Sequence, residues 1–184
     1  MTITTVNPAL TGTYNLDVTH SRLGFVARHA MVTKVRGSFT DFTGTAVLDA
    51  EDPSRSHAEV TIQVASVDTG NEQRDGHLRT NDFFDAETYP EIRFVSTKAE
   101  RVDDDNYRLT GDLTIKGITK EVAVDFEFTG LVADPWGNQR AGFEGKAVIN
   151  RKDWGVNFNA ALEAGGVLVS EKITLEFDIS AVKA

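Results

Sequence analysis

The densest group of side chains that could do chemistry lies in residues 71–82. It holds Arg74, Asp75, His77, Arg79 and Asp82. One interpretation is a polar gate that contacts one end of a ligand. The other is a set of hydrogen bonds and ion pairs that ties this segment onto the rest of the fold, and we favour it slightly.

A nucleophilic triad is suggested by His20 and Ser21, which follow Asp17 closely in the chain. We reject it, because no G-x-S-x-G turn presents a serine nucleophile. Thiol chemistry is excluded outright, since the chain has no cysteine. An enzyme that uses His29, His77 and Asp75 as acid–base groups stays open as an alternative.

A metal site is not predicted. His20 and His29 are nine positions apart, so an unbroken strand would aim them at opposite faces. The sequence has no H-E-x-x-H motif and no clustered carboxylate loop. His57 lies in a predicted turn, where we expect it to be solvated, and we expect no cofactor.

Composition limits the partners. A net charge of -9 and a pI near 4.9 argue against nucleic acid and against tight electrostatic binding to an anionic membrane. Residues 1–17 lack the basic and apolar regions of a signal peptide, and no stretch reaches the roughly 18 apolar residues of a membrane helix. We therefore expect a soluble cytoplasmic protein without stable membrane insertion.

The elements that must position these side chains are strands. Apolar residues alternate with polar ones along most of the 184 residues, as in residues 23–29 and 122–128. Short turns, such as residues 103–106 and 134–138, separate these runs. The alternation predicts an all-β fold, either an antiparallel barrel of about eight strands or a strongly curled sandwich.

Three segments break the alternation. Residues 66–94 predict one or two short helical turns that cover the end of a closed sheet. Residues 29–37 are consistent with a single helical turn, after which Phe39 begins a strand that bends near Asp41. Residues 157–166 predict a loop. Residues 1–10 predict a loosely held lead, and residues 11–184 a single domain.

Space inside the barrel is suggested by small residues in the inward phase of the strands. These are Ala27, Gly44, Ala46, Ala58, Gly111, Gly145 and Ala147. A barrel of about eight strands either fills its interior with side chains or holds one ligand. From the small residues alone, a filled barrel and a cavity are equally supported.

Several motifs, in order along the chain, resemble those of the YceI-like family. They are Tyr14-x-Leu16-Asp17-x-x-His20-Ser21, Gln73-Arg74-Asp75-Gly76-His77-Leu78, Asp82-Phe83-Phe84, Tyr89-Pro90, residues 113–120 and Ile149-Asn150-Arg151-Lys152-Asp153-Trp154-Gly155. The resemblance implies a lipocalin-like barrel with a short helical cap that binds a polyisoprenoid or another long-chain lipid. It favours a cavity over a filled barrel.

The resemblance also implies where such a ligand would lie. The lumen residues expected to contact a lipid tail are Leu23, Phe25, Ala27, Phe42, Val60, Ile62, Val64, Leu78, Phe83, Phe84, Phe94, Leu113, Ile115, Val124, Phe126, Phe143, Ala147, Ile149, Trp154 and Phe177. The head group is assigned to His29, Arg74, His77 and Arg79.

The predicted function is therefore to carry or sequester a long-chain lipid without a reaction. The ligand would be an isoprenoid, a quinone or a fatty acid derivative, and pairing into a homodimer is left open. Besides the enzyme, the alternative is a filled barrel that acts as a stress-related interaction protein.

Overall fold

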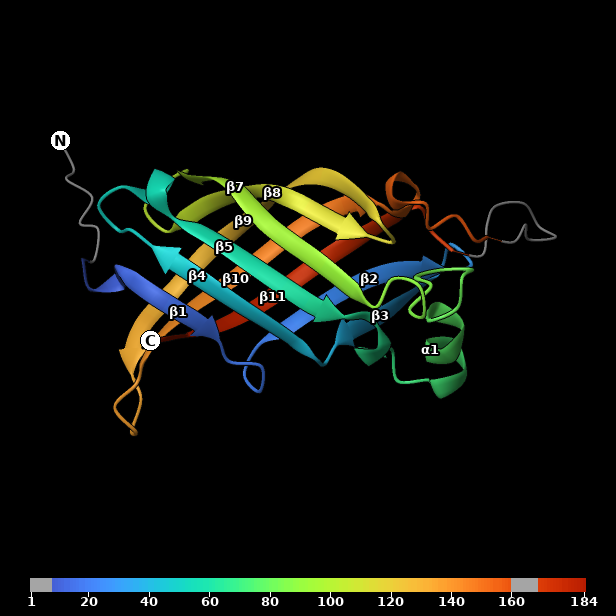
Figure 1. Cartoon of the computed structure of the whole chain (residues 1–184), viewed down its shortest axis with the longest axis horizontal. Helices are drawn as coiled ribbons and strands as arrows, with labels where there is room; N and C mark the ends of the chain where they lie inside the picture. The colour runs from blue at the N-terminus through green and yellow to red at the C-terminus, as the bar shows by residue number, and fades with distance from the viewer. Residues whose placement is uncertain (1–7, 160–168) are drawn as a thin grey trace.

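Antiparallel strands dominate the computed structural model, which describes residues 8–159 and 169–184 (Figure 1). The strands are β1 (Gly12–Leu16), β2 (Arg22–His29), β3 (Thr33–Phe39), β4 (Phe42–Leu48), β5 (His57–Gln63), β6 (Val67–Asp68), β7 (Glu91–Arg101), β8 (Asn106–Ile115), β9 (Ile118–Ala133), β10 (Gln139–Asn150) and β11 (Lys172–Lys183). Helical segments are α1 (Glu72–Leu78) and the 3-10 turns η1 (Pro8–Leu10), η2 (Pro53–Arg55), η3 (Val64–Ser66) and η4 (Arg151–Trp154).

The described strands close into a ring with eight positions. From β7 to β11 each strand pairs with the next along the chain. The other edge of β11 pairs first with β2 and then with β1. Three positions are each filled by two short strands in succession: β1 with β2, β3 with β4, and β5 with β6. β5 then pairs with β7 and completes the barrel, which confirms the predicted fold class.

The alternation of the sequence matches the faces of the strands. In β9, Val122 and Val124 are buried while Ala123 and Asp125 between them are exposed. The chain also bends at Thr40, between β3 and β4, next to the predicted position. Because side chains alternate between faces in a strand, this pattern sends the apolar set into the barrel.

The helical turn predicted in residues 29–37 is wrong. β2 and β3 form a hairpin there, with His29 opposite Thr33. Ala30 and Met31 have positive φ angles of 51° and 64°, and they turn the chain. Three loop residues interrupt the alternation, which imitates the signature of a helix. Phe39 consequently ends β3 rather than beginning a strand.

The segment between β6 and β7 contains the predicted helix and lies at one end of the barrel (Figure 1). We call residues 69–90 the cap. Asn71 is the N-cap of α1, since its side-chain oxygen accepts a hydrogen bond from the Arg74 backbone N–H. The capping-box pattern formed by Thr88 and Glu91 does not start a helix, because Glu91 begins β7.

Two clusters of buried side chains divide the interior. The larger, at the cap end, includes Phe83, Leu113 and Trp154. The smaller, at the opposite end, is built on Tyr14 and Ala141, neither of which is exposed at all. The barrel is therefore closed by packed side chains at the end away from the cap. Of the predicted loop 157–166, only residues 157–159 are described, and they are neither helix nor strand.

Candidate ligand-binding cavity

A cavity of about 160 Å³ lies in the cap half of the barrel. Twelve residues assigned to the lumen from the sequence line it: Leu23, Phe25, Ala27, Ile62, Leu78, Phe83, Phe84, Leu113, Ile115, Ile149, Trp154 and Phe177. In the described part of the chain, its wall exposes carbon atoms and no nitrogen or oxygen. Such a space favours hydrocarbon over water, since a buried water needs polar partners.

Eight other assigned residues do not line this cavity. They are Phe42, Val60, Val64, Phe94, Val124, Phe126, Phe143 and Ala147. Val64, Val124 and Ala147 are buried in the larger cluster, and Phe94 and Phe126 pack against it. Phe143 belongs to the smaller cluster at the closed end. These side chains support the barrel rather than contact the space inside it.

The small inward residues leave less space than expected. Leu16 lies over Gly44, Phe94 over Gly111 and Phe126 over Gly145, so a β-carbon at any of these glycines would meet a side chain. Of the seven small residues, only Ala27 lines the cavity. The inference from small residues to space is therefore wrong at the glycines, where larger neighbours pack into the gap.

The cavity has eight further lining residues that the site assignment missed: Gly24, Phe39, Ile92, Arg151, Val156, Val169, Ile173 and Leu175. The alternation could have found Ile173 and Leu175, because both are in phase with Phe177. No local signal marked Val156 or Val169, which lie outside the strands.

Arg151 is the unexpected member of the wall. It is 5% exposed, and burial lowers the pKa of its guanidinium. The guanidinium donates to the carbonyl oxygens of Val156 (2.7 Å), Ser170 (2.8 Å) and Val169 (3.3 Å). No carboxylate of the described chain lies within ion-pair distance. Arg151 thus fastens the start of β11 beside the cavity through backbone acceptors.

The polar side chains of α1 and of Arg79, which follows it, hold the cap together and attach it to the barrel. Asp75, 6% exposed, accepts hydrogen bonds from the backbone N–H of Thr69 (2.9 Å) and from its hydroxyl (2.5 Å). Arg74 donates from Nε to the Thr69 hydroxyl and from Nη2 to the Thr69 carbonyl. Arg79 donates from Nε to the carbonyl of Ala65, 3.0 Å away. The bond from Arg79 attaches the cap to the barrel, as the interpretation favoured from the sequence requires, whereas the bonds of Asp75 and Arg74 lie within the cap.

His77 and His29 have different surroundings. The imidazole Nε2 of His77 is 2.8 Å from Oδ2 of Asp82, and the ring contacts Phe83 and Phe158 edge-on. His29 is exposed at the end of β2, and its backbone forms an isolated antiparallel β-bridge with Val169. Within the described chain, no hydrogen bond or ion pair joins any two of His29, Asp75 and His77. The three acid–base groups of the enzyme alternative therefore do not form a constellation.

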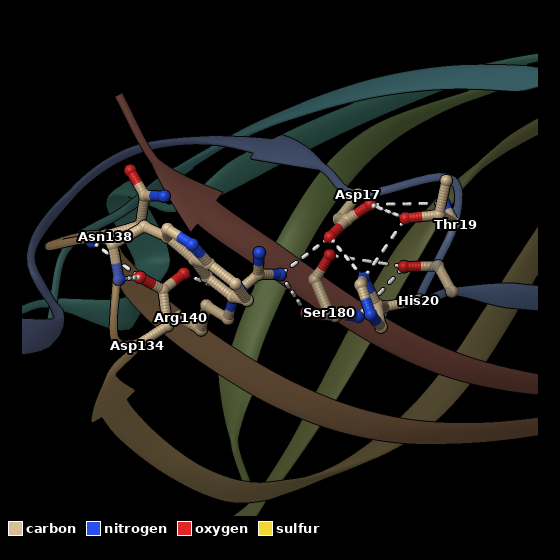
Figure 2. Close-up of polar contacts among 9 residues, drawn as sticks. Asp17, Thr19, His20, Asp134, Asn138, Arg140 and Ser180 are labelled. Carbon is tan, nitrogen blue, oxygen red and sulfur yellow. Dashed lines mark hydrogen bonds and ion pairs between the residues drawn. The ribbon is translucent and has the colours of Figure 1, made fainter.

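Two of the rejected triad residues, Asp17 and His20, belong to a structural network at the closed end (Figure 2). His20 Nδ1 lies 2.7 Å from Oδ2 of Asp17. The hydroxyl of Ser21 accepts from the backbone N–H of Ser180 and donates to its carbonyl, so it bridges to β11. Arg140 donates to Asp17. The arrangement therefore links the start of β10 and the end of β11 to the residues that follow β1. The hydroxyl of Ser21 is occupied by hydrogen bonds to the backbone of Ser180 and does not act as a nucleophile.

The described residues contain neither a cluster of metal-binding side chains nor a helix that could span a membrane. No group of three or more histidine, cysteine, aspartate or glutamate side chains could hold a metal ion in that part of the chain. Among the described helices, none combines the length and apolar character needed to cross a bilayer.

Comparison with known proteins decides the family. The model of the YceI-like domain matches residues 14–181. The chain belongs to the YceI-like family. A relative, the UPF0312 protein plu2095 of Photorhabdus laumondii, is 41% identical over 156 residues, which cover 84% of this chain and 80% of the relative. The YceI-like match includes all of the barrel except the first two residues of β1 and the last two of β11.

Solved structures agree with this YceI-like architecture. BcnA of Burkholderia cenocepacia has a TM-score of 0.78 at 27% identity, and the match covers 90% of this chain and 98% of BcnA. A polyisoprenoid binding domain from Saccharophagus degradans has a TM-score of 0.69 at 15% identity, covering 93% and 98% of the two chains. At this low identity the second likeness shows the fold alone.

Proposed function

We propose that this YceI-like protein binds the hydrocarbon chain of a long-chain lipid, an isoprenoid above all, and carries or sequesters it unchanged. The observation that supports the proposal is the cavity beneath the cap, whose described wall exposes only carbon. The polyisoprenoid binding described for the Saccharophagus barrel is consistent with it. No reaction is proposed, because no acid–base constellation of the described residues faces the cavity.

The size of the cavity defines what must happen on binding. About 160 Å³ is close to the roughly 150 Å³ of an engineered cavity that accepts one benzene. Pockets for larger ligands are about 300–1,000 Å³. A long chain must therefore widen the space. Leu78, Phe83 and Phe84 of the cap can move aside without breaking a strand pair, whereas the β-sheet wall cannot.

Chain length should set the affinity. Each buried methylene contributes about 0.8 kcal/mol, so ten contribute about 8 kcal/mol before the cost of lost freedom is subtracted. A single head-group hydrogen bond adds only about 1 kcal/mol net. Short chains should therefore bind weakly, and the affinity should rise steadily with each pair of carbons.

The head group would lie outside the carbon-lined space. Of the four residues assigned to it, Arg74 already donates to the hydroxyl and carbonyl oxygens of Thr69 in the cap, and Arg79 to the carbonyl oxygen of Ala65 in the barrel. The proposal therefore assigns the head group to the cap end of the barrel near His29 and His77, where exposure leaves room for polar groups of different kinds. Selection among head groups should be weak.

The first test identifies the ligand. The purified protein is extracted with organic solvent and the extract analysed by mass spectrometry, with a heat-denatured and washed sample as the control. We expect a long-chain lipid in amounts comparable to the protein. Binding is then measured by displacement of a fluorescent polyene fatty acid across a series of chain lengths.

A filling variant locates the site. Ala27→Phe places a ring in the cavity and should weaken binding about tenfold or more, since it occupies space that the chain needs. Val148→Phe is the matched control, because Val148 is 63% exposed on the outer face of β10 and the same ring there meets water. Equal affinity in the two variants, both folded, would show that the chain binds elsewhere. No displaceable signal in the parent protein would favour a filled barrel.

A further inference from the structure

The β2–β3 hairpin has a charge unlike the rest of the chain. The protein contains 28 acidic and 19 basic residues, yet no acid occurs between Asp17 and Asp41. That interval contains four basic residues, Arg22, Arg28, Lys34 and Arg36. The hairpin therefore has a local charge of about +4 on a protein whose net charge is -9.

These positive charges are not neutralised by described acids, although the guanidinium of Arg22 donates to the carbonyl oxygen of Gly37 at 3.5 Å. All four basic residues are exposed, and none forms an ion pair with a described acid. Arg28 donates from Nη1 to the carbonyl of Val32 at 3.3 Å, which directs it toward the hairpin tip. The backbone N–H of Arg28 donates to the hydroxyl of Ser170, which brings the neighbouring Glu171 close to the hairpin. Glu171 is nevertheless paired with Lys152, 2.8 Å away, and not with Arg28. The charges are consequently available to a partner.

The tip of this hairpin is apolar where a turn is usually polar. Ala30 and Met31 adopt left-handed φ angles of 51° and 64°, a conformation that hairpin turns normally give to glycine or asparagine. Met31 is 60% exposed and Val32 77% exposed. A non-glycine residue in this region costs about 1–2 kcal/mol. The turn thus presents apolar side chains to water at a conformational cost.

The position of the hairpin connects it to the cavity. Leu23, Phe25 and Ala27 on β2 line the cavity, and the tip projects at the end of the barrel where α1 lies (Figure 1). His29 bridges to Val169, another lining residue. A partner that contacts the tip is therefore held next to the cap end of the barrel.

We propose that the tip of the β2–β3 hairpin docks reversibly on the surface of a lipid bilayer that contains anionic lipids. Apolar side chains flanked by basic ones are the combination that binds the headgroup region of such a bilayer. The overall negative charge opposes contact only weakly, because charges more than about 8–10 Å from the surface are screened by salt. A second copy of the chain is a poor partner, since it would bring like charges together.

Docking goes beyond lipid binding in the cavity and can occur with the cavity empty. The test is flotation of the full-length protein with vesicles of phosphatidylcholine, with and without phosphatidylglycerol, at physiological and at high salt. We expect the protein to float with the anionic vesicles at physiological salt, where the distant negative charges are screened, and to be released at high salt. Protein that never floats with anionic vesicles would overturn docking while leaving cavity binding intact.

Two pairs of variants assign the contact to the hairpin. Lys34→Glu with Arg36→Glu should reduce partitioning at least about thirtyfold, since each basic residue near an anionic surface contributes about fivefold. Lys98→Glu with Lys146→Glu, on the outer faces of β7 and β10, makes the same change in net charge. An equal loss in this control would show that net charge alone governs binding, and would contradict the proposal.

The apolar part of the contact is tested separately. Met31→Ser with Val32→Ser should abolish most of the partitioning that persists at intermediate salt. The matched control is Val132→Ser with Trp136→Ser, which removes side chains that are 62% and 79% exposed at the opposite end of the barrel. If the Met31 and Val32 variant instead changes the oligomeric state in size-exclusion chromatography, a second copy covers the tip and docking on lipid is overturned.

Discussion

The ring of Phe94 on β7 lies directly over Gly111 on β8. A β-carbon on Gly111 would be 2.6 Å from Cζ of Phe94 and 2.6 Å from the carbonyl oxygen of Val95. The aromatic ring could rotate, but the carbonyl belongs to the sheet and cannot. Glycine at this position therefore allows the ring to fill the interior, in the manner of close-packed protein cores.

Gly111→Ala should consequently destabilise the fold by about 2 kcal/mol, because overpacking a fixed wall forces backbone shifts. Urea unfolding followed by fluorescence measures the change. Gly76→Ala is the companion variant, since no atom lies within 4 Å of the added methyl group in α1. It should stabilise the protein by about 0.5–1 kcal/mol. Equal effects of the two variants would contradict the packing described for Gly111.

The same contact explains what the sequence could and could not predict. Alternation is a local property, so it predicted the strands and their buried faces. It left a barrel and a curled sandwich open, and the resemblance to the YceI-like family decided for the barrel. Whether a small inward residue leaves space depends on the rotamer of a neighbour on another strand. Ala27 borders the cavity, while Gly145 is covered by Phe126, and nothing in the two local sequences distinguishes them.

The cap and Arg151 also differ in whether the sequence could assign them to the cavity. Leu78, Phe83 and Phe84 could be assigned to the cavity because they are the apolar side chains of a polar segment that covers a barrel end. Arg151 could not, since an arginine is expected at the surface. It is buried because three backbone carbonyls converge on it, one from nearby Val156 and two from Val169 and Ser170, which only the folded chain brings close.

At the closed end, Asp17 accepts a hydrogen bond of 2.6 Å from Arg140 Nη1 and one of 2.7 Å from the hydroxyl of Thr19 (Figure 2). Arg140 is the main reason that the pKa of Asp17 lies well below its usual range. Asp17→Asn should cost about 2 kcal/mol of unfolding free energy near neutral pH, since the side chain is only 16% exposed.

That cost should depend on pH with a defined sign. A depressed pKa stabilises the folded state above the unfolded pKa of about 3.9, and the stabilisation is lost as pH falls toward the folded pKa. The difference between the parent protein and Asp17→Asn should therefore shrink below about pH 4. Urea unfolding at several pH values checks this. Asp125→Asn, in the exposed pair with Arg108, is the control and should change stability little.

The buried hydroxyl of Tyr14 anchors the start of the barrel by donating to the carbonyl of Leu10, 2.8 Å away. Tyr14→Phe should cost about 1 kcal/mol, the net worth of one hydrogen bond. Burial raises the pKa of Tyr14, so the unfolded chain loses this proton first as pH rises. The parent protein should lose stability above about pH 10 for this reason, and Tyr14→Phe should lose less. Parallel pH curves for the two proteins would contradict the assignment.

The contact between Asp75 and Thr69 should control how quickly a long chain enters the barrel. Asp75→Ala removes the acceptor of both Thr69 bonds and should destabilise the cap by about 2 kcal/mol, because it leaves two part-buried donors unpaired. Hydrogen exchange should accelerate in α1 and remain slow in β8 to β10, since the ladder is intact.

If the cap must move aside for a chain to enter the cavity, this variant should bind and release the fluorescent fatty acid faster than the parent, by about tenfold or more. Glu72→Ala is the matched control, because Glu72 is an exposed acid on the same helix. Stopped-flow fluorescence separates the two rates. Faster exchange of α1 amides with unchanged ligand rates would show that the chain enters by a route that does not pass beneath the cap.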